Sequence, residues 1–240
     1  MSSYTVLHGD CRDLLPNIGR VQHIITDPPY EAEAHTRGRR LLGRQKSGQR
    51  TVEYGALDFD HITSEERDES ARLMVAACSG WLLIFCQAEA VAAWRASITA
   101  GGGRYMRAMV WIKPDGAPQF TGDRPGMGYE SIVAAWCGEG RSRWNGGGRR
   151  GVFTHAQRDS NSPKLHMTQK PVALMRELVA LFTNPGETVA DPYAGSGTTG
   201  VAAIALGRNF IGMERELRHV DTACARLDAA GRQLQIEMEA

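Results

Sequence analysis

Residues 187–216 read ETVADPYAGSGTTGVAAIALGRNFIGMERE, and this stretch decides the fold class. The apolar run 188–190 predicts a strand that leads into Asp191. A G-x-G-x-x-G pattern begins at Gly195, and glycines at this spacing let the chain turn tightly into a helix while a ligand approaches the backbone. A helix of small residues and a strand at 209–213 follow, so the unit predicts an α/β fold with a parallel sheet.

The glycine loop predicts a nucleoside-type ligand, but the pattern alone leaves its identity open. It formally fits the dinucleotide fingerprint, which allows NAD, whereas a P-loop is disfavoured because no lysine follows Gly197. Asp191 would repel a pyrophosphate and suits a cationic ligand instead, such as the amino acid end of S-adenosylmethionine. Glu214, at the tip of the next strand, is placed to accept hydrogen bonds from ribose hydroxyls.

Outside this unit, strands and helices alternate along the chain. Apolar runs predict further strands at 4–8, 21–26, 81–86, 104–112 and 130–136, and helical patterns predict helices at 63–78, 88–99, 171–182, 198–206 and 216–238. This alternation predicts a single domain over residues 1–240, with a mostly parallel sheet covered by helices on both faces.

A second distinctive stretch, HIITDPPYEAEA, covers residues 23–34. A short buried strand ends abruptly at Asp27-Pro28-Pro29-Tyr30, because neither proline can donate a backbone hydrogen bond. The simpler interpretation is a proline-rich turn without a catalytic role. The alternative is a rigid catalytic corner that holds a carboxylate and an aromatic ring at the end of a strand.

Charge is unevenly distributed, although the net charge is only +1. Segments 35–50 and 141–164 hold 12 of the 28 Lys/Arg and one of the 27 Asp/Glu, so the rest of the chain is acidic. This segregation favours a polyanionic partner over two merely solvated loops. The segments fall in two stretches without a regular pattern, 31–57 and 137–165, which we predict to be basic loop insertions.

The cysteines, the histidines and the lengths of the apolar runs exclude several classes of protein. Five scattered cysteines with no C-x-x-C pair favour reduced thiols over disulfides, and no His/Cys spacing predicts a metal site. No apolar run approaches a membrane span, and residues 1–15 lack the features of a signal peptide, so we expect a cytoplasmic protein.

Three motifs in this order give a family resemblance: Asp27-Pro28-Pro29-Tyr30, then HMTQKP at 166–171, then DPYAGSGTTG at 191–200. The chain resembles the beta group of amino-group DNA methyltransferases, a permuted group found in bacteria and their phages. The resemblance implies a three-layer Rossmann-like sheet of about seven strands, with one strand reversed. It also implies S-adenosylmethionine as cofactor and double-stranded DNA as partner. A homodimer stays open, and no nuclease subunit is inferred.

The resemblance also implies roles for individual residues. The catalytic corner would be Asp27, Pro28, Pro29 and Tyr30. The cofactor would be held by Asp10, Thr168, Lys170, Asp191, Ala194, Gly195, Gly197, Thr198, Thr199 and Glu214. DNA would be held by Arg37, Arg39, Arg40, Arg44, Lys46, Arg141, Arg143, Arg149 and Arg150. For Asp10 the alternative is a helix N-cap, and for Lys170 it is a solvated lysine before a helix.

The chemistry of an amino-group methyltransferase suits the corner. The exocyclic amine of adenine or cytosine is a poor nucleophile, and two acceptors on its hydrogens can free its lone pair. Asp27 and the carbonyl of Pro28 would be those acceptors, and Tyr30 would stack on a base turned out of the duplex. By family association, Asp27 favours adenine N6, with cytosine N4 as the alternative. An NAD-dependent oxidoreductase, an inactive DNA-binding protein, and a methyltransferase acting on RNA or protein are weaker alternatives.

Overall fold

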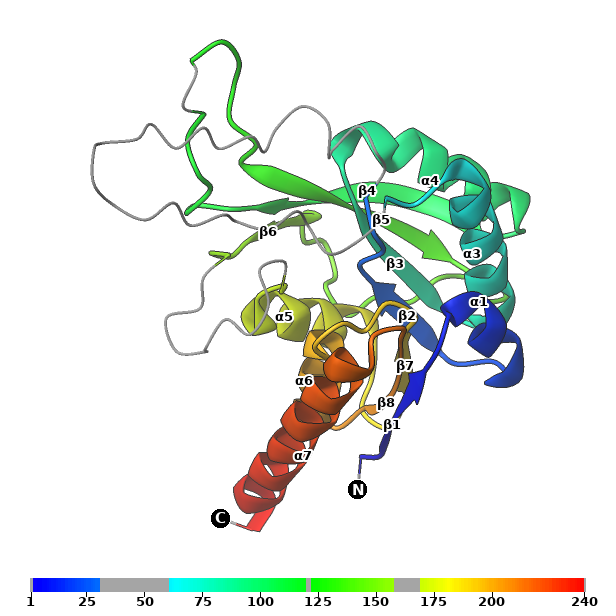
Figure 1. The fold of residues 1–240 in the computed structure, drawn as a ribbon, viewed down its shortest axis with the longest axis vertical. Helices are drawn as coiled ribbons and strands as arrows, with labels where there is room; N and C mark the ends of the chain where they lie inside the picture. Colours follow the sequence, from blue (N-terminus) through cyan, green and yellow to red (C-terminus); the bar gives the residue numbers. More distant parts are fainter. Residues whose placement is uncertain (1, 31–60, 120–121, 158–168, 240) are drawn as a thin grey trace.

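The computed structural model describes residues 2–30, 61–119, 122–157 and 169–239 (Figure 1). One eight-stranded sheet has the order β1-β8-β7-β2-β3-β5-β4-β6. The strands are β1 (Tyr4–His8), β2 (His23–Thr26), β3 (Trp81–Cys86), β4 (Arg104–Ile112), β5 (Tyr129–Trp136), β6 (Val152–Thr154), β7 (Thr188–Asp191) and β8 (Asn209–Glu214). The longer helices are α3 (Ser64–Ala77), α4 (Val91–Ala100), α5 (Val172–Phe182), α6 (Thr198–Ala205) and α7 (Leu217–Glu239). A short helix, α1 (Cys11–Leu14), follows β1.

The reversed strand of the sheet is β5, which pairs antiparallel with both β3 and β4. All other strand pairs are parallel. The expected Rossmann-like sheet with one reversed strand is therefore confirmed. The eighth strand is β6, which lies inside the stretch 137–165 that the sequence predicts to be an irregular loop. That part of the loop prediction is wrong because three residues, Val152–Thr154, become a strand only by pairing with β4.

Helices cover both faces of the sheet, as expected from the alternation. On one face α5, α6 and α7 pack on residues such as Leu83 and Phe85, and on the other face α1, α3 and α4 pack on Leu82 and Ile84 (Figure 1). All six residues of β3 are buried, which explains why this central strand reads as a continuous apolar run.

The helix boundaries follow local signals in the sequence. Thr63 caps α3 through a reciprocal capping box, in which its hydroxyl accepts from the backbone N–H of Glu66 and the Glu66 carboxylate accepts from the N–H of Thr63. Pro171 immediately precedes α5, where its missing N–H costs nothing. Within the residues described, no helix combines the length and apolar character needed to cross a membrane.

The boundary between β7 and β2 is the switch point of the sheet. The connection that leaves β2 leads to α3 on one face, whereas β7 leads to α6 on the other face. In open α/β sheets, ligands bind outside the carboxyl ends of the strands at such a point. The Asp27 corner and the glycine loop both lie there, because they follow β2 and β7 directly.

Candidate active site at the carboxyl edge of the sheet

The Asp27 corner contacts Lys170, which lies two residues before α5. Lys170 Nζ is 2.5 Å from Asp27 Oδ2, and the two side chains are 10% and 26% exposed. The other oxygen, Asp27 Oδ1, is buried and has no hydrogen-bond partner among the described residues. The alternative of a solvated lysine is therefore wrong for Lys170. The corner therefore holds one carboxylate oxygen paired with a cation and one buried oxygen that has no donor among the described residues.

Lys170 also contacts Glu130, the second residue of β5, at 3.2 Å from Glu130 Oε2. The other oxygen of Glu130 accepts a hydrogen bond from Lys113, which follows β4. The sequence analysis missed both Glu130 and Lys113. The available signal in the sequence was weak. Glu130 is an acid at the start of an otherwise apolar predicted strand, and Lys113 directly follows the predicted strand before it.

The charges of this cluster shift the pKa values of Asp27, Lys170 and Glu130. Burial raises the pKa of Asp27, and the positive charge of Lys170 opposes that shift. Burial works to lower the pKa of Lys170, but the charges of Asp27 and Glu130 outweigh it and raise the pKa. Burial works against ionisation of Glu130 too, yet Lys170 and Lys113 lower its pKa to about 2. The four groups therefore form a chain of alternating charge.

Tyr30 and the prolines complete the corner. Pro28 is buried, and Pro29 and Tyr30 are half-buried. The Tyr30 ring centroid lies 5.6 Å from Lys170 Nζ, and burial followed by the charge of Asp27 raises the pKa of the tyrosine hydroxyl. The ring is thus held beside the same ammonium that contacts the carboxylate.

The glycine loop turns as the sequence predicts. Gly195 and Gly197 have φ of 52° and 77°, a left-handed conformation that favours glycine. Glu214 Oε2 accepts from the backbone N–H of Gly195 at 2.9 Å, and its Oε1 accepts from that of Glu216 at 2.8 Å. Glu214 therefore holds the loop close to the end of β8. Ala194 is buried behind the loop.

Asp191 braces the loop from inside. Its Oδ1 accepts from the Thr26 hydroxyl at 2.7 Å and from the Tyr193 N–H at 3.1 Å, and its Oδ2 accepts from the Thr199 hydroxyl at 2.6 Å. The residue is 3% exposed, and burial raises its pKa to about 6. Asp191, the acid that the sequence predicts to suit a cationic ligand, is thus a buried support of the loop, and its contact with a cofactor stays a prediction. Thr198, also buried, contacts Arg226 of α7 at 3.2 Å.

Asp10 is the N-cap of α1. Its Oδ1 accepts from the Arg12 N–H at 2.9 Å, and its Oδ2 forms an ion pair with the Arg12 guanidinium at 2.8 Å. The N-cap alternative is confirmed, and contact of Asp10 with a cofactor stays a prediction. Thr168 lies outside the described residues. Its neighbour Gln169 places Oε1 in a buried position that has no hydrogen-bond partner within the described part of the chain.

A family model described as N6_N4_Mtase, DNA methylase, matches residues 21–225. The chain belongs to this family. The DNA methylase is similar over 93% of its length to the type II methyltransferase M.HinfI of Haemophilus influenzae, with 27% identity and 68% of that relative covered. A shorter match of 65 residues, 49% identical, relates it to the DNA adenine methyltransferase YhdJ of Escherichia coli strain K12, and covers 27% of this chain and 22% of that relative.

Solved structures share the fold of the methylase. The M1.HpyAVI complex with SAM matches with a TM-score of 0.72 and 24% identity, over 94% of this chain and 99% of that one. The cytosine-N4-specific PvuII DNA methyltransferase matches with the same TM-score, 0.72, and 16% identity, over 98% and 93%. The expected α/β methyltransferase fold is thus confirmed, and the fold alone does not separate adenine from cytosine as the target.

The methylase has a site that fits S-adenosylmethionine, the cofactor of its family. A Cβ built at Gly195 meets nothing within 4 Å, so the loop backbone is open to an approaching ligand. Gln169 Oε1, an acceptor without a partner among the described residues, suits the ammonium of the methionine end. Each oxygen of Glu214 accepts one backbone hydrogen bond and keeps a second lone pair, which suits ribose hydroxyls. These residues surround the carboxyl edge beside Asp27.

The structure describes only some of the basic residues that the sequence predicts to bind DNA. Arg37, Arg39, Arg40, Arg44 and Lys46 lie outside the described residues. The other four, Arg141, Arg143, Arg149 and Arg150, are all exposed. The Arg143 carbonyl accepts from the indole N–H of Trp81, the first residue of β3, so this loop lies at the amino edge of the parallel strands. The structure therefore does not bring Arg141 and Arg143 to the Asp27 corner.

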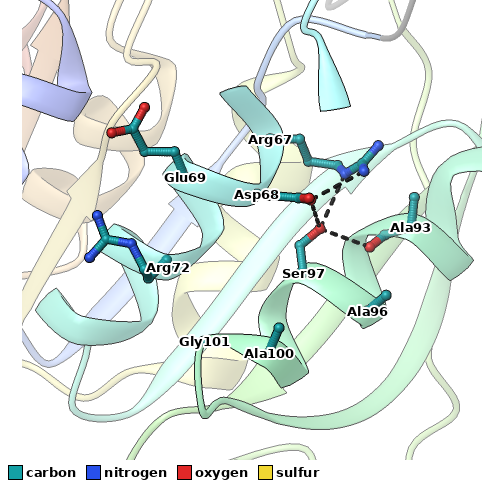
Figure 2. A pocket seen from close by; sticks show the side chains of 9 residues that line it. All are labelled: Arg67, Asp68, Glu69, Arg72, Ala93, Ala96, Ser97, Ala100 and Gly101. Carbon is teal, nitrogen blue, oxygen red and sulfur yellow. Dashed lines mark hydrogen bonds and ion pairs between the residues drawn. The ribbon is translucent and has the colours of Figure 1, made fainter. Parts of the chain in front are cut away.

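A hollow between α3 and α4 is separate from this site (Figure 2). It has a volume of about 490 Å³ and none of the predicted site residues lines it. Its central polar groups bond to one another, since the Ser97 hydroxyl donates to Asp68 at 2.5 Å and accepts from Arg67 at 3.2 Å. The hollow offers no open acceptor comparable to Asp27 Oδ1.

Proposed function

We propose that this DNA methyltransferase methylates the N6 amine of adenine in double-stranded DNA, after the base has turned out of the duplex. The observation that carries the proposal is the buried oxygen Asp27 Oδ1, which has no hydrogen-bond partner in the described part of the chain and lies at the switch point, beside a loop that fits the cofactor. An unsatisfied buried acceptor is costly, and it persists where a ligand supplies the missing donor.

The base amine needs two acceptors, and the corner offers both. Asp27 Oδ1 accepts one amine hydrogen, and the carbonyl of Pro28 accepts the other. The two bonds draw the nitrogen toward tetrahedral geometry and stabilise the positive charge that develops on it. The fixed φ of Pro28 and Pro29 keeps the acceptors oriented before the base arrives.

S-adenosylmethionine, when bound, would supply the methyl group and keep the electron pair of its carbon–sulfur bond. The surplus proton of the methylated amine would leave to solvent. Asp27 faces the nitrogen throughout and holds the two amine hydrogens with the Pro28 carbonyl. No covalent bond between the chain and the base is required.

The base must leave the duplex to reach this buried oxygen, at a cost of a few kcal/mol. Tyr30 offsets part of that cost by stacking, worth about 1–3 kcal/mol per base. Its hydroxyl is buried, so the ring is fixed in place at the mouth of the corner. The ring and the carboxylate together form a pocket for a planar base that carries an amine.

Adenine is favoured over cytosine by two considerations. Asp27 occupies the first position of the corner, which the family associates with adenine, and YhdJ is named an adenine methyltransferase. The similarity to a cytosine-N4-specific enzyme shows that the same fold also serves cytosine. Cytosine N4 is therefore the alternative outcome of the test.

The test is transfer of labelled methyl groups from S-adenosylmethionine to unmethylated DNA, followed by nucleoside analysis. We expect N6-methyladenine, and N4-methylcytosine would overturn the adenine assignment. Asp27→Asn should abolish transfer while S-adenosylmethionine binding, measured by calorimetry, changes little. Asp221→Asn provides a matched control, because Asp221 is an exposed carboxylate on α7.

A further inference from the structure

Glu130 reaches the Asp27 corner because β5 is reversed. The first residues of β5 lie at the same edge as the carboxyl ends of the parallel strands, since Ser131 pairs with Cys86, the last residue of β3. Glu130 pairs in turn with Trp111 of β4, and Lys113 follows β4 at the same edge. Two charged residues from one hairpin thus point into the site from the side opposite the glycine loop.

The contacts form one continuous line from Asp27 to Lys113. Lys170 Nζ lies between Asp27 Oδ2 at 2.5 Å and Glu130 Oε2 at 3.2 Å, and Lys113 donates to Glu130 Oε1. The side chains of Lys170, Glu130 and Lys113 are 10%, 14% and 10% exposed. Both ammonium groups also lie over aromatic rings, with Lys170 Nζ 5.1 Å from the Phe85 centroid and Lys113 Nζ 4.7 Å from that of Trp111.

The four charges sum to zero, and each has a neighbour of opposite sign. Buried charges are stable only when they are paired in this way. If Glu130 were neutral, two ammonium groups would face Asp27 alone. Lys170 would then bind only Asp27, and the site would carry a net positive charge beside the amine.

That imbalance matters because positive charge develops on the amine during methyl transfer. A carboxylate tightly neutralised by Lys170 stabilises this charge less well than one whose lysine is shared with a second carboxylate. Asp27 must remain ionised and turned so that Oδ1 faces the amine. Lys170 fixes that orientation, and Glu130 limits how strongly Lys170 neutralises Asp27.

We propose that Glu130 is a positioning residue for methyl transfer, which acts through Lys170 to keep Asp27 oriented and able to accept the amine hydrogens. This inference rests on the proposed function. Lys113 holds Glu130 and balances its charge. The charged or titratable groups that face Asp27 from the packed elements are Lys170, Glu130, Lys113, Asp191 and Tyr30, and Cys86 faces Tyr30.

The test compares Glu130→Gln and Lys113→Gln in single-turnover assays at saturating DNA and S-adenosylmethionine, over a range of pH. Glu130→Gln should lower the transfer rate roughly 10- to 100-fold while the Kd for each ligand stays within about threefold. The acid limb of the pH–rate profile should move to lower pH, because removing a negative neighbour lowers the pKa of Asp27. Lys113→Gln should move the same limb to higher pH.

Shifts of opposite sign are a signature that general structural damage would not produce. Glu130→Asp, which keeps the charge, should recover at least part of the rate lost in Glu130→Gln. Glu139→Gln is the matched control, since Glu139 is exposed in the loop at the other edge of the sheet. If Glu130→Gln does not fold, the transfer rates and acid limbs of Lys113→Gln and Glu130→Asp are compared with those of the wild-type protein instead.

The inference would be overturned if the folded variants showed unchanged transfer rates and unchanged acid limbs of the pH–rate profile. It would also be overturned if Glu130→Gln and Lys113→Gln moved the acid limb in the same direction. Failure of the proposed function looks different, because the wild-type protein would then transfer no methyl group to a DNA amine. The wild-type assay is therefore run first.

Discussion

Thr26 on β2 donates a 2.7 Å hydrogen bond to Asp191 on β7, across the switch point of the sheet. Both side chains are buried. The residue before Asp27, the proposed acceptor of the target amine, is therefore tied directly to the acid that braces the glycine loop. One hydrogen bond couples the position of the Asp27 corner to the position of that loop.

Thr26→Val tests this connection, because it keeps the shape of the side chain and removes the donor. We expect the free energy of unfolding to fall by about 1–3 kcal/mol, since Asp191 loses one of its bonds in a buried setting. Urea denaturation followed by circular dichroism measures the change. Thr99→Val, at an exposed threonine of α4, is the control, and equal losses in both variants would contradict the expectation.

The pH dependence of stability should carry a signature of Asp191. Burial raises its pKa to about 6 from an ordinary value of 3.8, so the folded state binds this proton more tightly than the unfolded state. Its contribution to stability is therefore fully present below pH 3.8 and is lost as pH rises to about 6. Asp191→Asn should remove this slope, which denaturation at several pH values between 4 and 7 would reveal. An identical slope in both proteins would refute the assignment.

Gly195 and Gly197 should respond differently to alanine. Both have positive φ, so each substitution costs roughly 1–2 kcal/mol of backbone strain. A Cβ at Gly197 would also lie 2.9 Å from the Cβ of Ala223 on α7, whereas one at Gly195 meets nothing.

We therefore expect Gly197→Ala to be the less stable variant in thermal unfolding. Gly195→Ala should instead weaken S-adenosylmethionine binding, because its new methyl group enters the open space beside the loop. Calorimetric titration checks the second expectation. The reverse ranking in either measurement would be inconsistent with the loop geometry.

The two basic segments should contribute unequally to DNA binding. Arg141 and Arg143 lie at the amino edge of the parallel strands, away from Asp27. We expect Arg141→Gln with Arg143→Gln to leave the slope of log affinity against log salt nearly unchanged. Arg37→Gln with Arg39→Gln should reduce that slope by about two, close to one for each lost phosphate contact. If the Arg141/Arg143 variant reduced the salt slope more than the Arg37/Arg39 variant, the result would support DNA contact by both basic segments.

Much of the fold follows from local sequence. The buried run of β3 and the glycine turn into α6 are each contained within a short segment, so their patterns are visible without tertiary context. The strand β6 is different, because Val152–Thr154 has no pattern of its own and depends on β4 for its hydrogen bonds.

The site was predictable to the extent that its residues occur in motifs. Asp27 and the glycine loop were found in this way, whereas Glu130 was not, because its role depends on Lys170, 40 residues away in the chain. The same limit explains Asp191. The sequence shows an acid beside a glycine loop, but only the packing of Thr26 and Thr199 around it shows that both its oxygens are already bonded.

The reversed strand β5 has a consequence for how new specificities could arise. The hairpin between β4 and β5 closes with the Lys113 N–H donating to the Gly128 carbonyl at 2.8 Å, so Lys113 and Glu130 are anchored on the two sides of one connection. Residues between these anchors can change in length or composition without displacing either charge. During divergence, the connection between β4 and β5 could therefore be replaced by one of another length or sequence. Lys113 and Glu130 would keep their positions while the residues of the new connection contact the substrate.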